Sequence, residues 1–288
     1  MLSIIISSYK TLNFSAITKN ICETIGIPYE IIKIDNPNLM GICEAYNKGA
    51  RMAKFDYYLF LHEDILFHDK DWGLKLLNHF SCPDTGVIGI AGGSYVPKAP
   101  CGWGTLRPYN HLSLMQNDST GKNQILYTLD VPKKKVLGID GVFLAVSKKT
   151  YLKNPFNEKV QGFHGYDLDF SLRIAKKQQN YIVGDILLEH FSNGNPDIKW
   201  LENNIQIRKE LGNDFNKKKN SRVETEIFNS FLRTYLLSYG FSIKNILKTL
   251  HFYPIKFIKF KDHVFLLKHI YAYLKFKREY IKKYGKSN

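Results

Sequence analysis

Three ionisable side chains follow directly on one of the most apolar runs of the chain. Residues 57–61 (Tyr-Tyr-Leu-Phe-Leu) are typical of a strand buried on both faces. His62, Glu63 and Asp64 come next. In extended backbone, His62 and Asp64 point to one side and Glu63 to the other. An imidazole and a carboxylate converging at a strand end would suit a divalent cation or a phosphate-bearing ligand, although a solvated acidic turn explains the same residues.

Two further segments carry residues that could act in catalysis or in ligand binding. Asp167 and Asp169 fall in the first turn of an expected helix, where the helix dipole favours acids by about 0.3–1 kcal/mol. One of these acids could instead deprotonate an incoming hydroxyl. His190 follows the strand expected over 181–188. It is expected to be either a hydrogen-bonded structural residue or a metal ligand. All three places lie at expected strand ends or strand-to-helix junctions, so they could converge on one rim of one sheet.

The first two thirds of the chain alternate between strand-like and helix-like patterns. Strands are expected over residues 2–8, 29–34, 57–61, 86–91, 136–147 and 181–188, and helices over 13–24, 39–54, 71–80, 167–177 and 197–211. This order indicates a doubly wound α/β structure. Residues 92–135 break the rhythm and are expected to form a long functional loop.

Several classes of protein are excluded or disfavoured. The chain has no GxGxxG after its first strand and no GxxxxGK[ST], so the usual dinucleotide and P-loop fingerprints are absent. No run of about 18 apolar residues predicts a transmembrane helix, and residues 1–8 are interpreted as a first strand and not as a signal peptide. The 4 cysteines form no CxxC pair, which favours a reducing, cytoplasmic compartment.

The positive charge is concentrated at the C-terminal end. The net charge is +15, and residues 221–288 hold 14 Lys or Arg against 4 Asp or Glu, which is +10. This shift predicts a domain over 1–217 and a basic, aromatic helical extension over 218–288. Such a segment either binds an anionic membrane surface or packs as an ordinary helical subdomain. It carries no RRM or KH signature, and no nucleic acid is expected as a partner.

The motif order over roughly residues 1–212 resembles family-2-type glycosyltransferases of the GT-A fold, most closely the streptomycin-biosynthesis-type branch. The resemblance implies a Rossmann-like sheet flanked by helices, followed by a mainly helical basic extension. In such enzymes the end of the first strand and an acid after the second strand contact the nucleotide, and an A-x-N-x-G element follows. The matching positions are Ser7, Ser8, Tyr9, Asp35 and Asn47.

The metal motif of the family, D-x-D, falls on residues 62–64, with His62 in place of the first Asp. The resemblance implies that Asp64 binds Mn²⁺ or Mg²⁺ with His190, while His62 and Glu63 lie with the donor. The family's acidic pair falls on Tyr166 and Asp167, which makes Asp167 the expected general base. His164, Tyr166, Asp169 and Trp103 are expected on the acceptor side.

The implied activity is metal-dependent transfer of a sugar from a nucleotide-sugar, a UDP-sugar by expectation, to a saccharide or lipid-linked saccharide hydroxyl. Inversion of configuration and a role in surface polysaccharide or glycoconjugate synthesis, at the cytoplasmic face of a membrane, are expected with it. One alternative is a sugar-phosphate nucleotidyltransferase, which should carry a Gly-rich basic loop where residues 7–11 read Ser-Ser-Tyr-Lys-Thr. The other is a basic, non-enzymatic nucleic-acid-binding protein, which charge and aromatic content favour only in the C-terminal extension.

Overall fold

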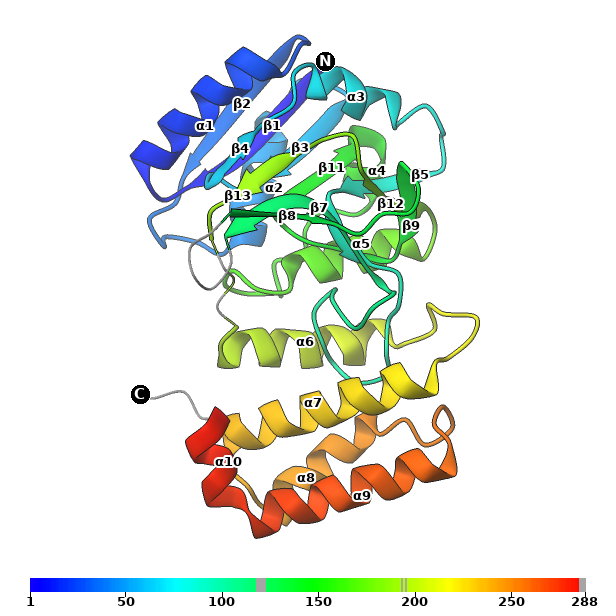
Figure 1. The fold of residues 1–288 in the computed structure, drawn as a ribbon. Helices are drawn as coiled ribbons and strands as arrows, with labels where there is room; N and C mark the ends of the chain where they lie inside the picture. The colour runs from blue at the N-terminus through cyan, green and yellow to red at the C-terminus, as the bar shows by residue number, and fades with distance from the viewer. Residues whose placement is uncertain (118–122, 193, 195, 285–288) are drawn as a thin grey trace. The chain divides into compact units, whose positions relative to one another are not determined.

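The computed structural model describes residues 1–117, 123–192, 194 and 196–284. The chain forms two compact units, the first made of residues 1–95 and 107–195 and the second of residues 96–106 and 196–288. Among the described residues, the strands lie in the first unit and the second unit is helical (Figure 1).

The first unit alternates strands with helices. It contains β1 (Leu2–Ser8), α1 (Thr11–Thr24), β2 (Tyr29–Asp35), α2 (Ile42–Met52), β3 (Tyr57–Leu61), β4 (Ile65–Phe67), α3 (Trp72–Asn78), β5 (Thr85–Gly89), β6 (Ala91–Gly93), β7 (Asn110–Asn117), β8 (Asn123–Tyr127), β9 (Lys133–Val136), β10 (Gly138–Ile139), β11 (Phe143–Ser147), α4 (Lys148–Lys153), α5 (Tyr166–Ala175), β12 (Gln179–Val183) and β13 (Leu188–His190).

The main sheet has the order β2-β1-β3-β11-β5-β12-β9. β1 is parallel to β2 and β3, whereas β11 runs antiparallel to β3 and β5. The central strands are buried on both faces, as the apolar runs of β1 and β3 predict. The expected α/β sheet flanked by helices is therefore confirmed, and it aligns the carboxyl ends of β1, β2 and β3 along one edge.

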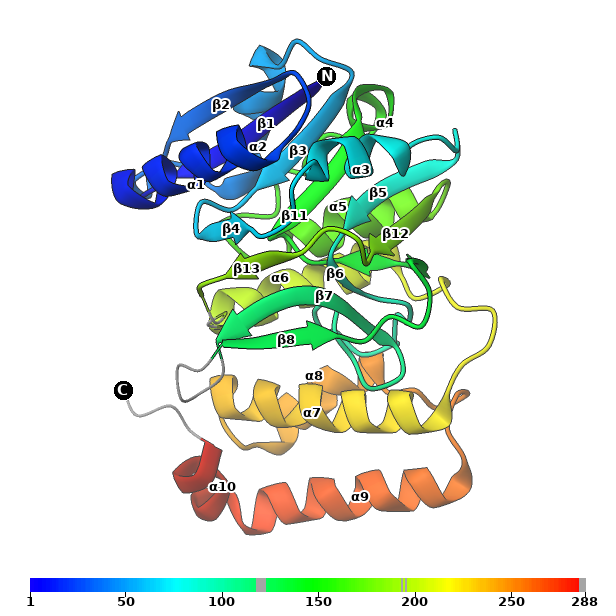
Figure 2. The ribbon, with the colours of Figure 1, turned by 45° about the horizontal axis from the view of Figure 1, so that its top comes forward.

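The expectation of one long loop over residues 92–135 is wrong. Four strands of the described residues, β6 to β9, lie wholly or partly within this range. β6, β7, β13 and β4 are neighbours in a second sheet, with β8 paired to β7 (Figure 2). The strands β6 to β9 carry many polar residues, so their local pattern is weak. Pairing with distant strands stabilises two of them, because β7 pairs with β13 and β9 pairs with β12.

Asn47 joins α2 to the segment that precedes α5. Its side chain is buried, donates to the Phe156 carbonyl and to Glu158 Oε1, and accepts from the Tyr151 hydroxyl and the Phe156 N–H. The polar atoms of this amide are therefore engaged inside the protein. Asn47 therefore stabilises the contact between α2 and this segment. Its expected contact with a nucleotide-sugar stays a prediction.

The second unit contains α6 (Ile198–Leu211), α7 (Ser221–Tyr239), α8 (Ile243–Thr249), a 3₁₀ turn (Leu250–Phe252), α9 (Phe260–Lys275) and α10 (Lys277–Tyr284). Its residues 96–106 are bound to α7, because the Lys98 N–H donates to Glu224 Oε2 over 2.9 Å. Glu224 is fully buried and also lies 3.8 Å from Lys219 Nζ. This division differs from the expected boundary between 217 and 218, since α6 and residues 96–106 group with the C-terminal helices.

None of the helices in the described part of the chain is both long and apolar enough to cross a membrane.

Replacing Asn47 with Ala should lower the free energy of unfolding, because the Tyr151 hydroxyl and the Phe156 N–H lose a buried acceptor. We expect a loss of about 1–3 kcal/mol, measured by urea denaturation. Asn157→Ala is the control, since that side chain accepts from the exposed N–H of Lys159. Equal stability of the two variants would contradict this structural role for Asn47.

Candidate active site

Strand pairing creates the candidate metal centre. His62 and Asp64 lie in the connection between β3 and β4, and His190 is the last residue of β13. β13 runs antiparallel to β4, with His190 opposite Ile65, and the Phe191 N–H donates to the Asp64 carbonyl over 3.1 Å. This ladder places His190 beside Asp64 even though the two residues are far apart in the sequence.

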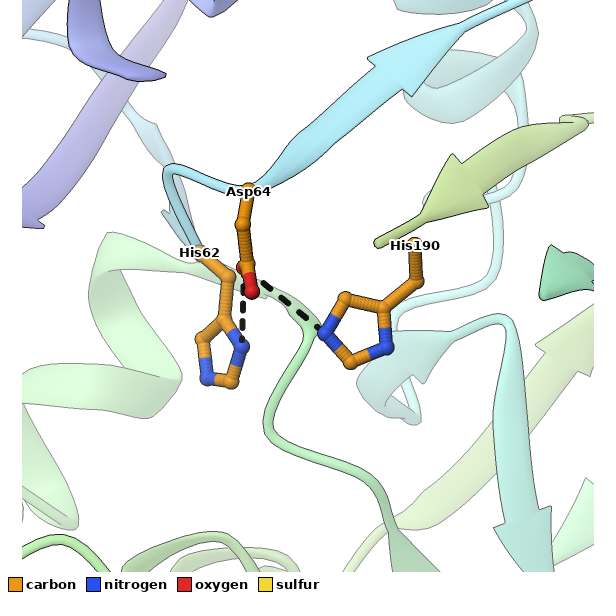
Figure 3. A group of neighbouring side chains, drawn as sticks. All are labelled: His62, Asp64 and His190. Atoms are coloured by element: carbon orange, nitrogen blue, oxygen red, sulfur yellow. Dashed lines mark ion pairs between the residues drawn. The ribbon is translucent and has the colours of Figure 1, made fainter. Parts of the chain in front are cut away.

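The three side chains face one point (Figure 3). Asp64 Oδ1 lies 3.8 Å from His62 Nδ1 and 3.7 Å from His190 Nε2. One donor atom from each residue lies within 4.8 Å of the other two. Burial, and then the neighbouring His62, hold the pKa of His190 below its usual value, which favours the neutral imidazole that binds cations. Two imidazoles and a carboxylate fit a divalent transition-metal ion.

Glu63 points away from this centre, toward the end of β1. Its Oε1 accepts from the backbone N–H groups of Tyr9 and Lys10, over 3.0 and 2.8 Å. The alternation expected for residues 62–64 is thus present in the structure. The two bonds fix the loop after β1, so Glu63 shapes the neighbouring cleft.

A cleft of about 350 Å³ adjoins the metal centre. Its lining contains five of the expected donor-side and metal residues, namely Ser7, Tyr9, His62, Glu63 and Asp64. The sequence interpretation missed other lining residues, among them Lys10, Asn13, Asn36, Asn38 and Phe163. The turn signal after the second strand could have identified Asn36, whose side chain accepts from the N–H groups of Leu39 and Met40 and donates to Ser7 Oγ.

Besides Asn47, two expected donor-side residues do not belong to this lining. Ser8 is buried in β1. The Asp35 side chain is 75% exposed at the end of β2 and pairs with Lys33. Contacts of either residue with a nucleotide stay predictions.

Asp167 lies at the start of α5, after Gly165, whose φ of 79° is in the left-handed region that glycine adopts readily. Asp167 Oδ2 accepts from the Gly141 N–H over 3.1 Å. Loss of hydration, and then the Asp140 carboxylate, raise the pKa of Asp167 to about 7, although N–H groups of Leu168 and Gly141 act in the opposite direction. A carboxylate with a pKa near 7 suits proton transfer at neutral pH. Asp140 was missed, although it directly follows the short strand β10.

The residues expected on the acceptor side differ in their surroundings. Asp169 is 1% exposed and forms a 2.8 Å ion pair with Arg173 one helical turn away, which is a structural contact. Tyr166 is buried and its hydroxyl lies 2.8 Å from His62 Nε2. His164 lies in the turn before α5, and Trp103 belongs to the second unit. Their acceptor-side roles stay predictions.

Comparisons with known proteins agree with this fold. The model of a family described as "Glycosyltransferase like family" matches residues 5–222. A crystal structure of GalNAc-T7 with UDP, GalNAc and Mn²⁺ is similar with a TM-score of 0.54 and 12% identity, over 91% of this chain and 55% of that chain. The chain thus spans about half the length of that relative.

A second solved structure, A197 from STIV, aligns with a TM-score of 0.41 and 14% identity, over 67% of this chain and 86% of that chain. No curated protein matches the sequence. The family match extends over about three quarters of the chain and includes the cleft, the metal centre and Asp167. It favours neither of the two alternatives, the nucleotidyltransferase and the nucleic-acid-binding protein. The chain therefore belongs to this glycosyltransferase-like family and has the GT-A fold.

Proposed function

We propose that the protein uses a divalent cation to transfer a sugar from a UDP-sugar to an acceptor hydroxyl. The observation that carries this proposal is the convergence of His62, Asp64 and His190 beside the cleft at the end of β1. The similar GalNAc-T7 structure was determined with UDP, GalNAc and Mn²⁺, which supports a uridine nucleotide and Mn²⁺ here.

Asp64 and His190 would hold the cation. When bound, such a cation stabilises the negative charge of the departing diphosphate as a Lewis acid. The cleft beside it would receive the nucleoside, with the exposed ring of Tyr9 available for contact with the base. Glu63 would maintain this cleft through its two bonds to the loop after β1.

Asp167 would accept the proton of the attacking hydroxyl. Its pKa of about 7 provides both a sizeable ionised fraction and a useful basicity at neutral pH. A base that assists direct attack on the anomeric carbon from the face opposite the leaving group gives inversion. The acceptor proposed for this reaction is a saccharide or a lipid-linked saccharide, in surface polysaccharide or glycoconjugate synthesis. Placement within the streptomycin-biosynthesis-type branch is part of the same proposal.

The outward face of α9 supports a membrane-associated acceptor. Leu266 and Tyr273 are buried, and the Tyr273 hydroxyl donates to Asn229 of α7, so one side of α9 faces the helical unit. Phe260 and Leu267, seven residues apart, are 84% and 60% exposed. Each is followed by an exposed lysine, and Lys275 continues this row. Apolar side chains flanked by lysines on one helix face fit the surface of an anionic membrane.

Removal of the cation should stop UDP release from UDP-sugars, and Asp64→Ala or His190→Ala should raise the Mn²⁺ concentration required by at least tenfold, because each variant loses a ligand. UDP release over a Mn²⁺ titration measures this effect. His68→Ala is the matched control, since His68 pairs with Glu189 outside the centre. Undiminished activity in EDTA would overturn the metal role.

Asp167→Asn should reduce transfer about 10²- to 10⁴-fold, because the base is lost. In the unsubstituted protein kcat/KM should rise with pH around 7, since only the deprotonated Asp167 accepts a proton. Asp140→Asn removes the charge that raises this pKa, so the rise should move to lower pH. Wild-type rates in Asp167→Asn would contradict the assignment, as would a pH dependence of kcat/KM that is unchanged in Asp140→Asn.

Inversion is tested separately, by NMR of the anomeric configuration of the product.

Reversing the charges of Lys261, Lys268 and Lys275 to Glu should weaken sedimentation with vesicles of 70% phosphatidylcholine and 30% phosphatidylglycerol by at least tenfold. Each lysine near anionic lipid contributes about 1 kcal/mol. The matched control reverses Lys149, Lys153 and Lys177, which are exposed on the first unit. Equal sedimentation of the two triple variants would count against α9 as the membrane surface.

A further inference from the structure

His62, in the connection after β3, and Tyr166, the first residue of α5, are in direct contact. The Tyr166 hydroxyl lies 2.8 Å from His62 Nε2, which is hydrogen-bond distance. Each side chain thus provides a partner for the other.

The Tyr166 ring is held in one place. It is 5% exposed and packs against Tyr46 and Phe156, with ring centroids 5.8 and 6.2 Å away. A Cβ atom at position 141 would collide with the Tyr166 hydroxyl, so only glycine leaves room for it. A fixed hydroxyl therefore faces His62.

This contact determines which nitrogen of His62 faces the metal centre. With Nε2 at the Tyr166 hydroxyl, Nδ1 is directed to Asp64 Oδ1, at 3.8 Å. Adjacent ligands of an octahedral cation at about 2.1 Å lie about 3 Å apart. His62 Nδ1 and His190 Nε2 are 3.8 and 3.7 Å from Asp64 Oδ1, so small shifts bring the three donors around one ion.

We propose that His62 is a third protein ligand of the cation, through Nδ1, and that Tyr166 is the positioning residue that accepts the hydrogen bond from Nε2–H. The proposal rests on the metal-dependent function proposed above and extends it to the ligand set and its support. A histidine ligand ordinarily donates its other N–H to such a partner, which fixes the tautomer and the ring orientation.

The ligand set has a consequence for the choice of metal. Two imidazoles and one carboxylate favour Mn²⁺ or Co²⁺ over Mg²⁺, which prefers oxygen ligands. A D-x-D motif would offer carboxylate oxygens where this chain offers the His62 nitrogen. We therefore expect the His62→Asp variant to gain Mg²⁺ affinity relative to Mn²⁺.

The test is calorimetric titration of the full-length protein with Mn²⁺ and, separately, with Mg²⁺. Tyr166→Phe keeps the packed ring and removes the hydroxyl, so Mn²⁺ affinity should fall about 10- to 100-fold. His62→Ala should lose at least as much. Tyr151→Phe is the matched control, because it removes a hydroxyl of the same aromatic cluster that bonds Asn47 and not His62. Its Mn²⁺ affinity should be unchanged.

The visible absorption of bound Co²⁺ provides a second readout that changes with the number of imidazole ligands, and it should differ between the unsubstituted protein and His62→Ala.

If Asp64→Ala abolishes Mn²⁺ binding while His62→Ala and Tyr166→Phe bind normally, the inference is wrong and the proposed function stands. Equal losses in Tyr166→Phe and Tyr151→Phe would also overturn it. If the unsubstituted protein does not bind Mn²⁺, the proposed metal-dependent function itself fails.

Discussion

The antiparallel pairing of β4 with β13 is the constraint on which the candidate site depends. It fixes His190 opposite Ile65 and joins Phe191 to the Asp64 carbonyl. Without this pairing, Asp64 would have one imidazole nearby from its own strand connection and none from the C-terminal part of the first unit. A site assembled from segments this distant exists only in the folded chain, so cation binding should be coupled to the stability of the second sheet.

The site separates two carboxylates by their surroundings. Asp64 lies between two imidazoles, an environment that suits a ligand. Asp167 lies beside Asp140, which together with burial raises its pKa to about 7, an environment that suits a base. Pairs of acids in contrasting environments commonly divide binding and proton transfer in this way. Tyr166 and Asp167 are neighbours at the start of α5. Because Tyr166 contacts His62 and Asp167 accepts from the Gly141 N–H, the start of α5 would connect the cation site with the proposed base.

Much of this arrangement could be predicted from the sequence because it depends on local pattern. The apolar runs before Ser7 and His62 identified β1 and β3, and alternation along an extended segment separated Glu63 from His62 and Asp64. The strands within residues 92–135 could not be predicted, since their polar residues weaken the local pattern, and β7 and β9 also pair with the distant strands β13 and β12. Asp169 and Asn47 were expected to have functional roles. Asp169 pairs with Arg173 one helical turn away, a contact that the i, i+4 spacing could have indicated. The bonds between Asn47 and Phe156 are tertiary contacts that residue type does not reveal.

We propose that a catalytic cation binds where β3, β4 and β13 meet. Anomalous diffraction at the manganese edge, from crystals grown with UDP and Mn²⁺, would locate this cation. One manganese peak is expected within about 2.0–2.3 Å of His62 Nδ1, Asp64 Oδ1 and His190 Nε2. A peak coordinated by other side chains, or UDP bound in the cleft with no manganese beside Asp64, would rule out this cation site.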